Sequence, residues 1–197
     1  MIAQAMSRRY SVWLIRVLRI TLFTILVALS ARIRIEIPPA APITGQTLAV
    51  FVTGMVLGPI EGAISLAIYV GAIALGAPID TRGLGAAVFA GPTAGYLWGF
   101  IAGAFIAGLA WRAPQRYRYP LSILAGLGAA IVILILGATG WALNQHIGWG
   151  DALLLTVYPF ILIEPGKVLL AASLVRLGRE SWIRWIVPRM TPGDPRS

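Results

Sequence analysis

Long apolar runs constrain the fold of this chain more than any other feature. Hydrophobic residues make up 58% of the sequence and charged residues only 12%, and the mean hydropathy is +0.83. These values are too apolar for a soluble domain, and the runs are long enough to cross a lipid bilayer. The sequence therefore predicts an all-α, polytopic membrane protein.

Six membrane spans are expected, at residues 12–31, 44–59, 61–76, 93–111, 121–143 and 152–175. The second and third are short, and the tight turn Gly58-Pro-Ile-Glu-Gly62 between them predicts a hairpin. The expected organisation is a transmembrane domain at 12–178 between terminal segments at 1–11 and 179–197. Residues 190–197 lack apolar side chains to fold around and are expected to form a frayed tail.

The arginines predict how the chain is oriented. A formal net charge of +9 suggests a nucleic-acid binder, but twelve of the fifteen arginines lie on one side of the expected topology. This is the pattern of the positive-inside rule for membrane proteins. It predicts a six-helix bundle with both termini in the cytoplasm (N-in, C-in) and no nucleic-acid partner. The three arginines expected outside are Arg32, Arg34 and Arg82.

The last span contains two charged residues of opposite sign, Glu164 and Lys167, and Lys167 is the only lysine in the chain. A charge at membrane depth costs roughly 2.5–3.5 kcal/mol and usually serves a ligand, an ion or a partner. The spacing i, i+3 places both on one helix face. Pro165-Gly166 between them predicts an interruption of the helix at this point. The alternative is a buried ion pair whose members only neutralise each other.

Two loops carry the other notable polar residues. After the first span, the alternation Arg32-Ile-Arg-Ile-Glu36 predicts an extended segment over the outer mouth of the bundle, or arginines that anchor the chain at the membrane interface. After the third span, residues 76–92 are rich in glycine yet apolar, which favours a lid or a re-entrant segment. In that loop Asp80 and Arg82 either reach a ligand, pair with each other or are solvated.

Small residues recur every four positions in the fourth span, at Gly95, Gly99 and Gly103. They form a face that allows close helix packing, either within the bundle or against another subunit. The neighbouring Tyr96 is expected to enter the bundle or to join an aromatic belt at the membrane interface. Oligomeric state therefore stays open.

Several chemistries lack the residues they need. There is no cysteine, and His146 is the only histidine, so no metal site is expected. The chain has no Gly-x-x-x-x-Gly-Lys phosphate loop and no hydrolase motif such as Gly-x-Ser-x-Gly or His-Glu-x-x-His. The protein is expected not to be an enzyme, to have no catalytic residues and to bind no cofactor. Any energy source must be another chain or a gradient.

An ordered set of short motifs between about Ala28 and Ala172 resembles the BioY family, the biotin-specific substrate-binding subunits (S-components) of energy-coupling factor (ECF) transporters. The motifs are Pro42-Ile-Thr-Gly-Gln-Thr47, Gly58-Pro59, Tyr69 with Gly76-Ala-Pro78, Gly91-Pro-Thr-Ala-Gly-Tyr96, and Tyr158-Pro-Phe160 followed by Glu164 and Lys167.

The resemblance implies a six-helix bundle that binds biotin near its outer face, capped by the loops after the first and third spans. It implies a transmembrane coupling protein and ABC-type ATPase subunits as partners, and a location in the bacterial inner membrane. Glu164 stands where the family usually has aspartate, so a biotin precursor or a related small carboxylate is an alternative ligand. A different mechanism is a stand-alone secondary transporter in which Glu164 is a proton or ion site.

Biotin's functional groups suggest partners for the candidate residues. The valerate carboxylate calls for a cation, with Lys167 first and Arg34 or Arg82 behind it. The ureido ring has two N–H donors and one carbonyl acceptor, and the thiophane ring needs an apolar wall. The residues expected near these two rings are Glu164, Gln46 and Asp80 for the ureido ring and Tyr96 or Phe160 for the thiophane ring.

Overall fold

The computed structural model describes the backbone of residues 2–186 and the side chains of residues 13–179. The expected tail at 190–197 lies outside the described residues. The all-α prediction is confirmed, with one two-residue hairpin as the exception. The elements are α1 (Ile2–Ser30), β1 (Arg34–Ile35), β2 (Ile43–Thr44), α2 (Gln46–Leu57), α3 (Pro59–Ala74), η1 (Gly85–Ala90), α4 (Ala94–Ala107), η2 (Gly108–Arg112), α5 (Gln115–Gln145), α6 (Trp149–Thr156), η3 (Tyr158–Phe160) and α7 (Ile163–Ile186).

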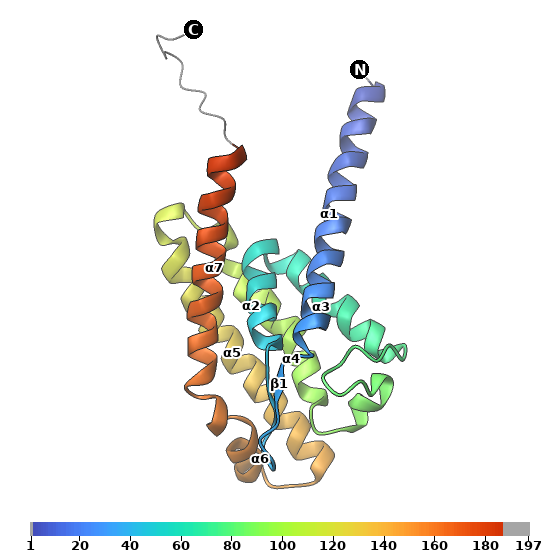
Figure 1. Cartoon of the computed structure of the whole chain (residues 1–197), viewed down its shortest axis with the longest axis vertical. Helices are drawn as coiled ribbons and strands as arrows, with labels where there is room; N and C mark the ends of the chain where they lie inside the picture. Colours follow the sequence, from blue (N-terminus) through green and yellow to red (C-terminus); the bar gives the residue numbers. More distant parts are fainter. Residues whose placement is uncertain (1, 187–197) are drawn as a thin grey trace.

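Helix length and apolar content vary among the expected spans. In the described part of the chain, α1, α5 and the stretch from α4 through η2 are each long and apolar enough to cross a bilayer. The segments Trp149–Phe160 and Ile163–Arg179 qualify together, as one span bent by 44°. The helices α2 and α3, of 12 and 16 residues, are apolar but shorter than the roughly 20 residues that a crossing needs. The start of α1 and the end of α7 lie at the same end of the molecule (Figure 1).

The turn between α2 and α3 follows from its sequence. Gly58 ends α2 with φ at 85°, a conformation that L side chains rarely adopt, and its N–H bonds to the carbonyl of Gly54. Pro59 then begins α3, where its missing N–H costs nothing. The Trp111 ring packs against Gly58 from η2. The expected tight turn is confirmed.

The small residues of α4 pack inside the bundle. The α carbons of Gly95 and Gly99 face the backbone of α5 at Leu136 and Ile133, so closely that a β carbon at Gly95 would collide with the Leu136 carbonyl. Gly103 faces the Ile133 side chain in the same way. Internal packing, one of the two expectations for this face, is therefore what the structure shows.

The interruption of the last span is not where the sequence predicted it. Glu164 and Lys167 both lie in the regular helix α7, and the chain bends before them, between η3 and α7. Pro165 falls in the first turn of α7, where no N–H is needed for helix bonding, so the proline starts the helix and does not break it. The prediction of a break between the two charges was wrong.

Two loops cover the end of the bundle where α7 begins. In the first, β1 pairs with β2 as an antiparallel hairpin, so the expected extended segment is confirmed. The second, residues 76–93, includes η1 and lies beside it. Arginines of the first loop bond to carbonyls of the second: Arg32 to Pro78 at 2.6 Å and Arg34 to Thr81 at 2.6 Å. The two loops thus form one cap.

Candidate functional site

A cavity lies under this cap, between α2, α4, α5 and the start of α7, and is named the Glu164 cavity below. Its volume is about 50 Å³. Of the eight residues predicted to bind substrate, seven line it and one does not. The seven are Glu164, Lys167, Tyr96, Gln46, Asp80, Arg82 and Phe160.

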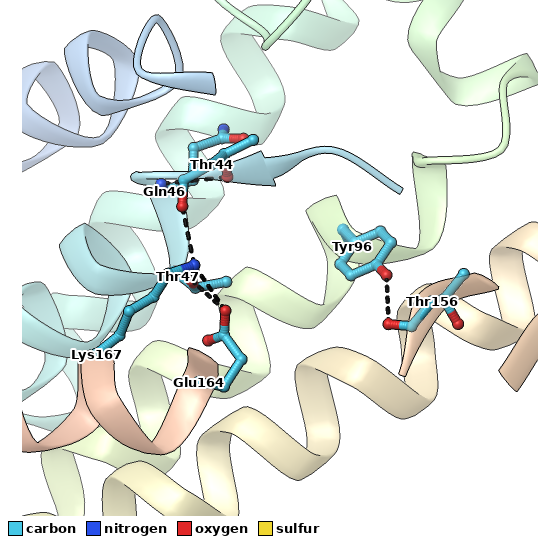
Figure 2. A network of polar contacts seen from close by, with 7 residues as sticks. All are labelled: Thr44, Gln46, Thr47, Tyr96, Thr156, Glu164 and Lys167. Atoms are coloured by element: carbon cyan, nitrogen blue, oxygen red, sulfur yellow. Dashed lines mark hydrogen bonds and ion pairs between the residues drawn. The ribbon is translucent and has the colours of Figure 1, made fainter. Parts of the chain in front are cut away.

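Glu164 and Lys167 form the polar centre of the cavity (Figure 2). The Lys167 ammonium donates to Glu164 Oε1 at 2.7 Å, to Thr47 Oγ1 at 2.8 Å and to the Thr44 carbonyl at 2.9 Å. The Thr47 hydroxyl in turn donates to Glu164 Oε1 at 3.0 Å. An ammonium has three N–H donors, so protein groups occupy all of them.

The second carboxylate oxygen of Glu164 is different. The side chain is only 2% exposed, and Oε2 is buried with no hydrogen-bond partner among the described residues. A buried acceptor without a partner costs about 1–3 kcal/mol, and more when it is charged. If the Glu164–Lys167 pair served only to neutralise charge, no interaction would offset the cost of burying Oε2 without a partner. Glu164 lines the cavity, so this unpartnered oxygen can instead accept a hydrogen bond from an N–H or O–H group of a ligand.

Gln46 is held between the bundle and the cap. Its side-chain nitrogen donates to the Tyr69 hydroxyl at 2.8 Å, and its side-chain oxygen accepts from the Thr81 hydroxyl at 2.6 Å. Tyr69 itself donates to the Ile79 carbonyl at 3.2 Å. One N–H of the Gln46 amide is left over, because the group has two.

The carboxylate of Asp80 and the guanidinium of Arg82 do not form an ion pair with each other in the described structure. Asp80 is buried, and its two oxygens accept the backbone N–H groups of Arg82 at 2.9 Å and Gly85 at 2.8 Å. Arg82 directs its guanidinium to Glu36 in the other loop, at 3.4 Å. The expectation that these two residues pair with each other or are solvated was therefore wrong for Asp80. Its carboxylate bonds to backbone N–H groups of the second loop, and the residue also lines the cavity.

Aromatic and aliphatic side chains form the opposite wall. The Tyr96 hydroxyl donates to the Thr156 carbonyl at 3.0 Å (Figure 2). The Tyr96 ring lies against Gly137 of α5. Tyr96 therefore belongs to the bundle interior and not to an interface belt. Phe160 is buried beside it. Sequence reasoning missed several further apolar lining residues, among them Leu97, Phe100 and Leu134.

Arg34 is the predicted residue that lies outside the cavity lining. Its guanidinium is on the outside of the cap, 40% exposed, where it bonds to the Thr81 carbonyl and lies 3.7 Å from Glu36. Sequence reasoning also missed Thr44, Thr47 and Thr81, which line the cavity. For Thr47 a signal existed, because it closes the motif that begins at Pro42.

A family model described as the BioY family matches residues 4–184 of this chain. The chain is 36% identical to the biotin transporter BioY of Thermotoga maritima over 157 residues, which cover 78% of this chain and 89% of that protein. It is 38% identical to the probable biotin transporter BioY of Pyrococcus horikoshii, over 79% of this chain and 90% of the relative.

A solved structure shares the fold. It is the crystal structure of the S-component for biotin from an ECF-type ABC transporter, and it covers 86% of this chain and 93% of its own with a TM-score of 0.72 at 23% identity. The named relatives are transporters and the structural neighbour is a transporter component. This agrees with the prediction that the chain is not an enzyme.

Proposed function

The chain belongs to the BioY family, and from this we propose that it is the biotin-binding transmembrane subunit of a biotin uptake transporter. It captures biotin at the outer face and delivers it inward together with a coupling protein and ABC-type ATPases. The observation that carries the proposal is the unpartnered Oε2 of Glu164, a residue that lines a capped cavity. The alternative of a stand-alone secondary transporter gains no support from the comparisons.

The hydrogen bonds in the cavity suggest how biotin is oriented. The three donors of Lys167 are occupied, while Glu164 Oε2 is not, so we assign Oε2 to a ureido N–H. The leftover N–H of Gln46 is placed to donate to the ureido carbonyl. The thiophane ring packs between Tyr96 and Phe160.

The carboxylate of biotin then points toward the cap. Arg82 lines the cavity from the second loop and is 45% exposed, so it is the cation nearest the mouth. It replaces Lys167 as the first candidate for the valerate carboxylate. Lys167 in this scheme holds Glu164 and Thr47 in position.

Biotin entry requires the cap to move. A cavity of about 50 Å³ is far below the roughly 300–1,000 Å³ of ligand pockets. Exposed arginine contacts tie the two loops of the cap to each other, namely hydrogen bonds from Arg32 to Pro78 and from Arg34 to Thr81 and the ion pair of Arg82 with Glu36. Exposed ion pairs contribute roughly 0–1 kcal/mol and hydrogen bonds roughly 0.5–1.5 kcal/mol each, so these contacts can break and re-form at low cost. The bond from Thr81 to Gln46 must also break for the second loop to leave the bundle.

The proposed topology is a six-span bundle in the bacterial inner membrane, with both termini cytoplasmic. The start of α1 and the end of α7 share one end of the molecule, as an even number of spans requires (Figure 1). That end holds most of the arginines, and the Glu164 cavity is at the other, outer end. In this scheme residues 12–178 form the substrate-binding domain, and residues 1–11 and 179–197 are cytoplasmic.

Retention of radiolabelled biotin by the purified protein in detergent tests the proposal. Glu164→Gln keeps the shape of the side chain but removes the anionic acceptor, and we expect at least roughly tenfold weaker binding. Asp151→Asn is the matched control, because Asp151 is an exposed acid outside the cavity. A folded Glu164→Gln variant that binds as tightly as the control would remove Glu164 from the site.

A further inference from the structure

The side-chain amide of Gln46, a residue that lines the Glu164 cavity, belongs to a chain of three hydrogen bonds. The Thr81 hydroxyl donates to Gln46 Oε1 at 2.6 Å, and Gln46 Nε2 donates to the Tyr69 hydroxyl at 2.8 Å. The Tyr69 hydroxyl in turn donates to the Ile79 carbonyl at 3.2 Å. Gln46 is 3% exposed and Tyr69 is fully buried, so water has little access to these bonds.

The Ile79 carbonyl sets the direction of this chain. A carbonyl oxygen accepts and never donates, so the single hydrogen of the Tyr69 hydroxyl is used on Ile79. Toward Gln46 that hydroxyl therefore presents a lone pair, which accepts an N–H. A reversed amide would bring its oxygen against the Tyr69 oxygen, and the hydroxyl would have to give up Ile79 to bond it. The bond to Ile79 thus fixes which end of the Gln46 amide faces Tyr69.

This orientation decides what Gln46 offers a ligand. The amide nitrogen has two N–H groups and Tyr69 accepts one, so the other remains for the cavity. In a reversed amide the carbonyl oxygen would take that place and would offer an acceptor. A glutamine amide is suited to both tasks, and the Tyr69 hydroxyl makes the choice between them.

We infer that Tyr69 is a specificity-determining residue of the Glu164 cavity. It is absent from the described lining of the cavity, so it acts through Gln46 as a positioning residue. By holding the amide with an N–H toward the cavity, it selects ligands that carry an acceptor there, such as the ureido carbonyl of biotin, over ligands that carry a donor. The inference rests on the proposed function, because it assigns this N–H to the ureido carbonyl.

The selection depends on a closed cap. Ile79 and Thr81 belong to the second loop, whereas Gln46 and Tyr69 belong to α2 and α3. When the second loop leaves the bundle, the bonds that it makes to these two side chains break, and the amide is free to turn. A ligand is therefore tested for an acceptor once the loop has closed over it.

Competition of 2-iminobiotin against labelled biotin, on the full-length protein in detergent at neutral pH, tests the inference. This compound keeps the two rings and the carboxylate of biotin, but a cyclic guanidinium replaces the ureido group and puts N–H donors where biotin has its carbonyl oxygen. We expect the wild type to bind biotin at least roughly tenfold more tightly, because 2-iminobiotin would leave two donors facing each other without an acceptor.

Tyr69→Phe keeps the ring and removes the hydroxyl, so the Gln46 amide can turn and accept from 2-iminobiotin. We expect the preference for biotin to fall to roughly twofold or less. A merely structural loss would weaken both compounds alike and leave their ratio unchanged. Tyr119→Phe is the matched control, because the Tyr119 hydroxyl bonds to Ser173, outside the Glu164 cavity, and this variant should keep the wild-type ratio.

Thr81→Val removes the donor at the other end of the amide but leaves Tyr69 in place, so both compounds should bind more weakly with the wild-type ratio. The inference is overturned if Tyr69→Phe keeps that ratio. It is also overturned if the wild type accepts 2-iminobiotin as readily as biotin, a comparison that holds even if Tyr69→Phe does not fold. A folded wild type that binds neither compound would contradict the proposed function itself, on which the inference rests.

Discussion

In the Glu164 cavity an ammonium lies 2.7 Å from a carboxylate, whereas a second cavity, between the start of α5 and the second half of α7, is lined by four arginines. The first arrangement balances its charges internally and leaves one acceptor oxygen over. In the second, the backbone carbonyls of Ala113 and Met55 accept hydrogen bonds from Arg118 and Arg179. The comparison teaches that one bundle holds its charged side chains in two ways: by an ion pair that leaves one acceptor oxygen over, and by bonds from guanidinium groups to backbone carbonyls.

Removing one member of the balanced pair should have the largest effect. Lys167→Ala leaves Glu164 buried with a single hydroxyl donor, Thr47, and we expect a loss of about 3–5 kcal/mol in stability, because an uncompensated charge remains. Thermal unfolding in detergent measures it. The double change Glu164→Gln with Lys167→Met should recover most of the stability without recovering biotin binding. A Lys167→Ala variant as stable as wild type would show that the pair is not the structural centre of this cavity.

Substitution of the cap residue Arg82 should have the next largest effect on biotin binding. The effect should depend on the carboxylate end of the ligand. Arg82→Gln should weaken biotin binding by roughly tenfold, the size of a partly exposed charge-assisted bond. Biotinamide, which lacks the carboxylate, should bind the variant and the wild type equally. Competition of both compounds against labelled biotin gives the comparison. Equal weakening of both compounds would move the carboxylate away from Arg82.

A smaller effect is expected from the Thr47 hydroxyl, which joins the two members of the ion pair in the Glu164 cavity. Thr47→Val removes the hydroxyl that joins Lys167 to Glu164 and should reduce biotin affinity by about 1 kcal/mol, the value of one hydrogen bond. Isothermal titration of biotin into the variant measures the loss, and thermal unfolding of the variant beside the wild type is the control. Unchanged biotin affinity would show that the Thr47 hydroxyl does not help to position Lys167 and Glu164 for the ligand.

The smallest effect is expected at Arg34. It lies on the outside of the cap, so Arg34→Gln should change biotin affinity by no more than about 0.5 kcal/mol, as for other exposed pairs. Any change should appear as faster dissociation, because Arg34 ties the two loops together. Stopped-flow displacement of biotin follows the rate. A loss as large as that of Arg82→Gln would place Arg34 in contact with the ligand.

The sequence predicted the features of this fold that depend on local patterns. Apolar runs indicated the helices, and Gly58-Pro59 indicated the turn between α2 and α3. The position of the bend in the last span could not be read in this way. Proline both breaks helices and starts them, and only the three-dimensional path of the chain decides that Pro165 lies in a first turn.

The candidate site was predictable where a residue is unusual for its surroundings. Glu164 and Lys167 stood out as charges in an apolar run, whereas Thr47, 117 positions before Glu164, was marked only by its place at the end of the motif that begins at Pro42. A threonine in an apolar helix is common, and no periodicity links it to a partner so far along the chain. The role of Asp80 in bonding backbone N–H groups was equally hidden, since the sequence suggested a ligand, the Arg82 side chain or solvent as its partner.

Isothermal titration of the wild-type protein in detergent with biotin, beside an unrelated vitamin, tests the central claim most directly. That claim is that the Glu164 cavity is a biotin site. The account predicts tight, one-to-one binding of biotin and no heat with the other vitamin. A folded sample that gives no heat with biotin would contradict the assignment of the Glu164 cavity.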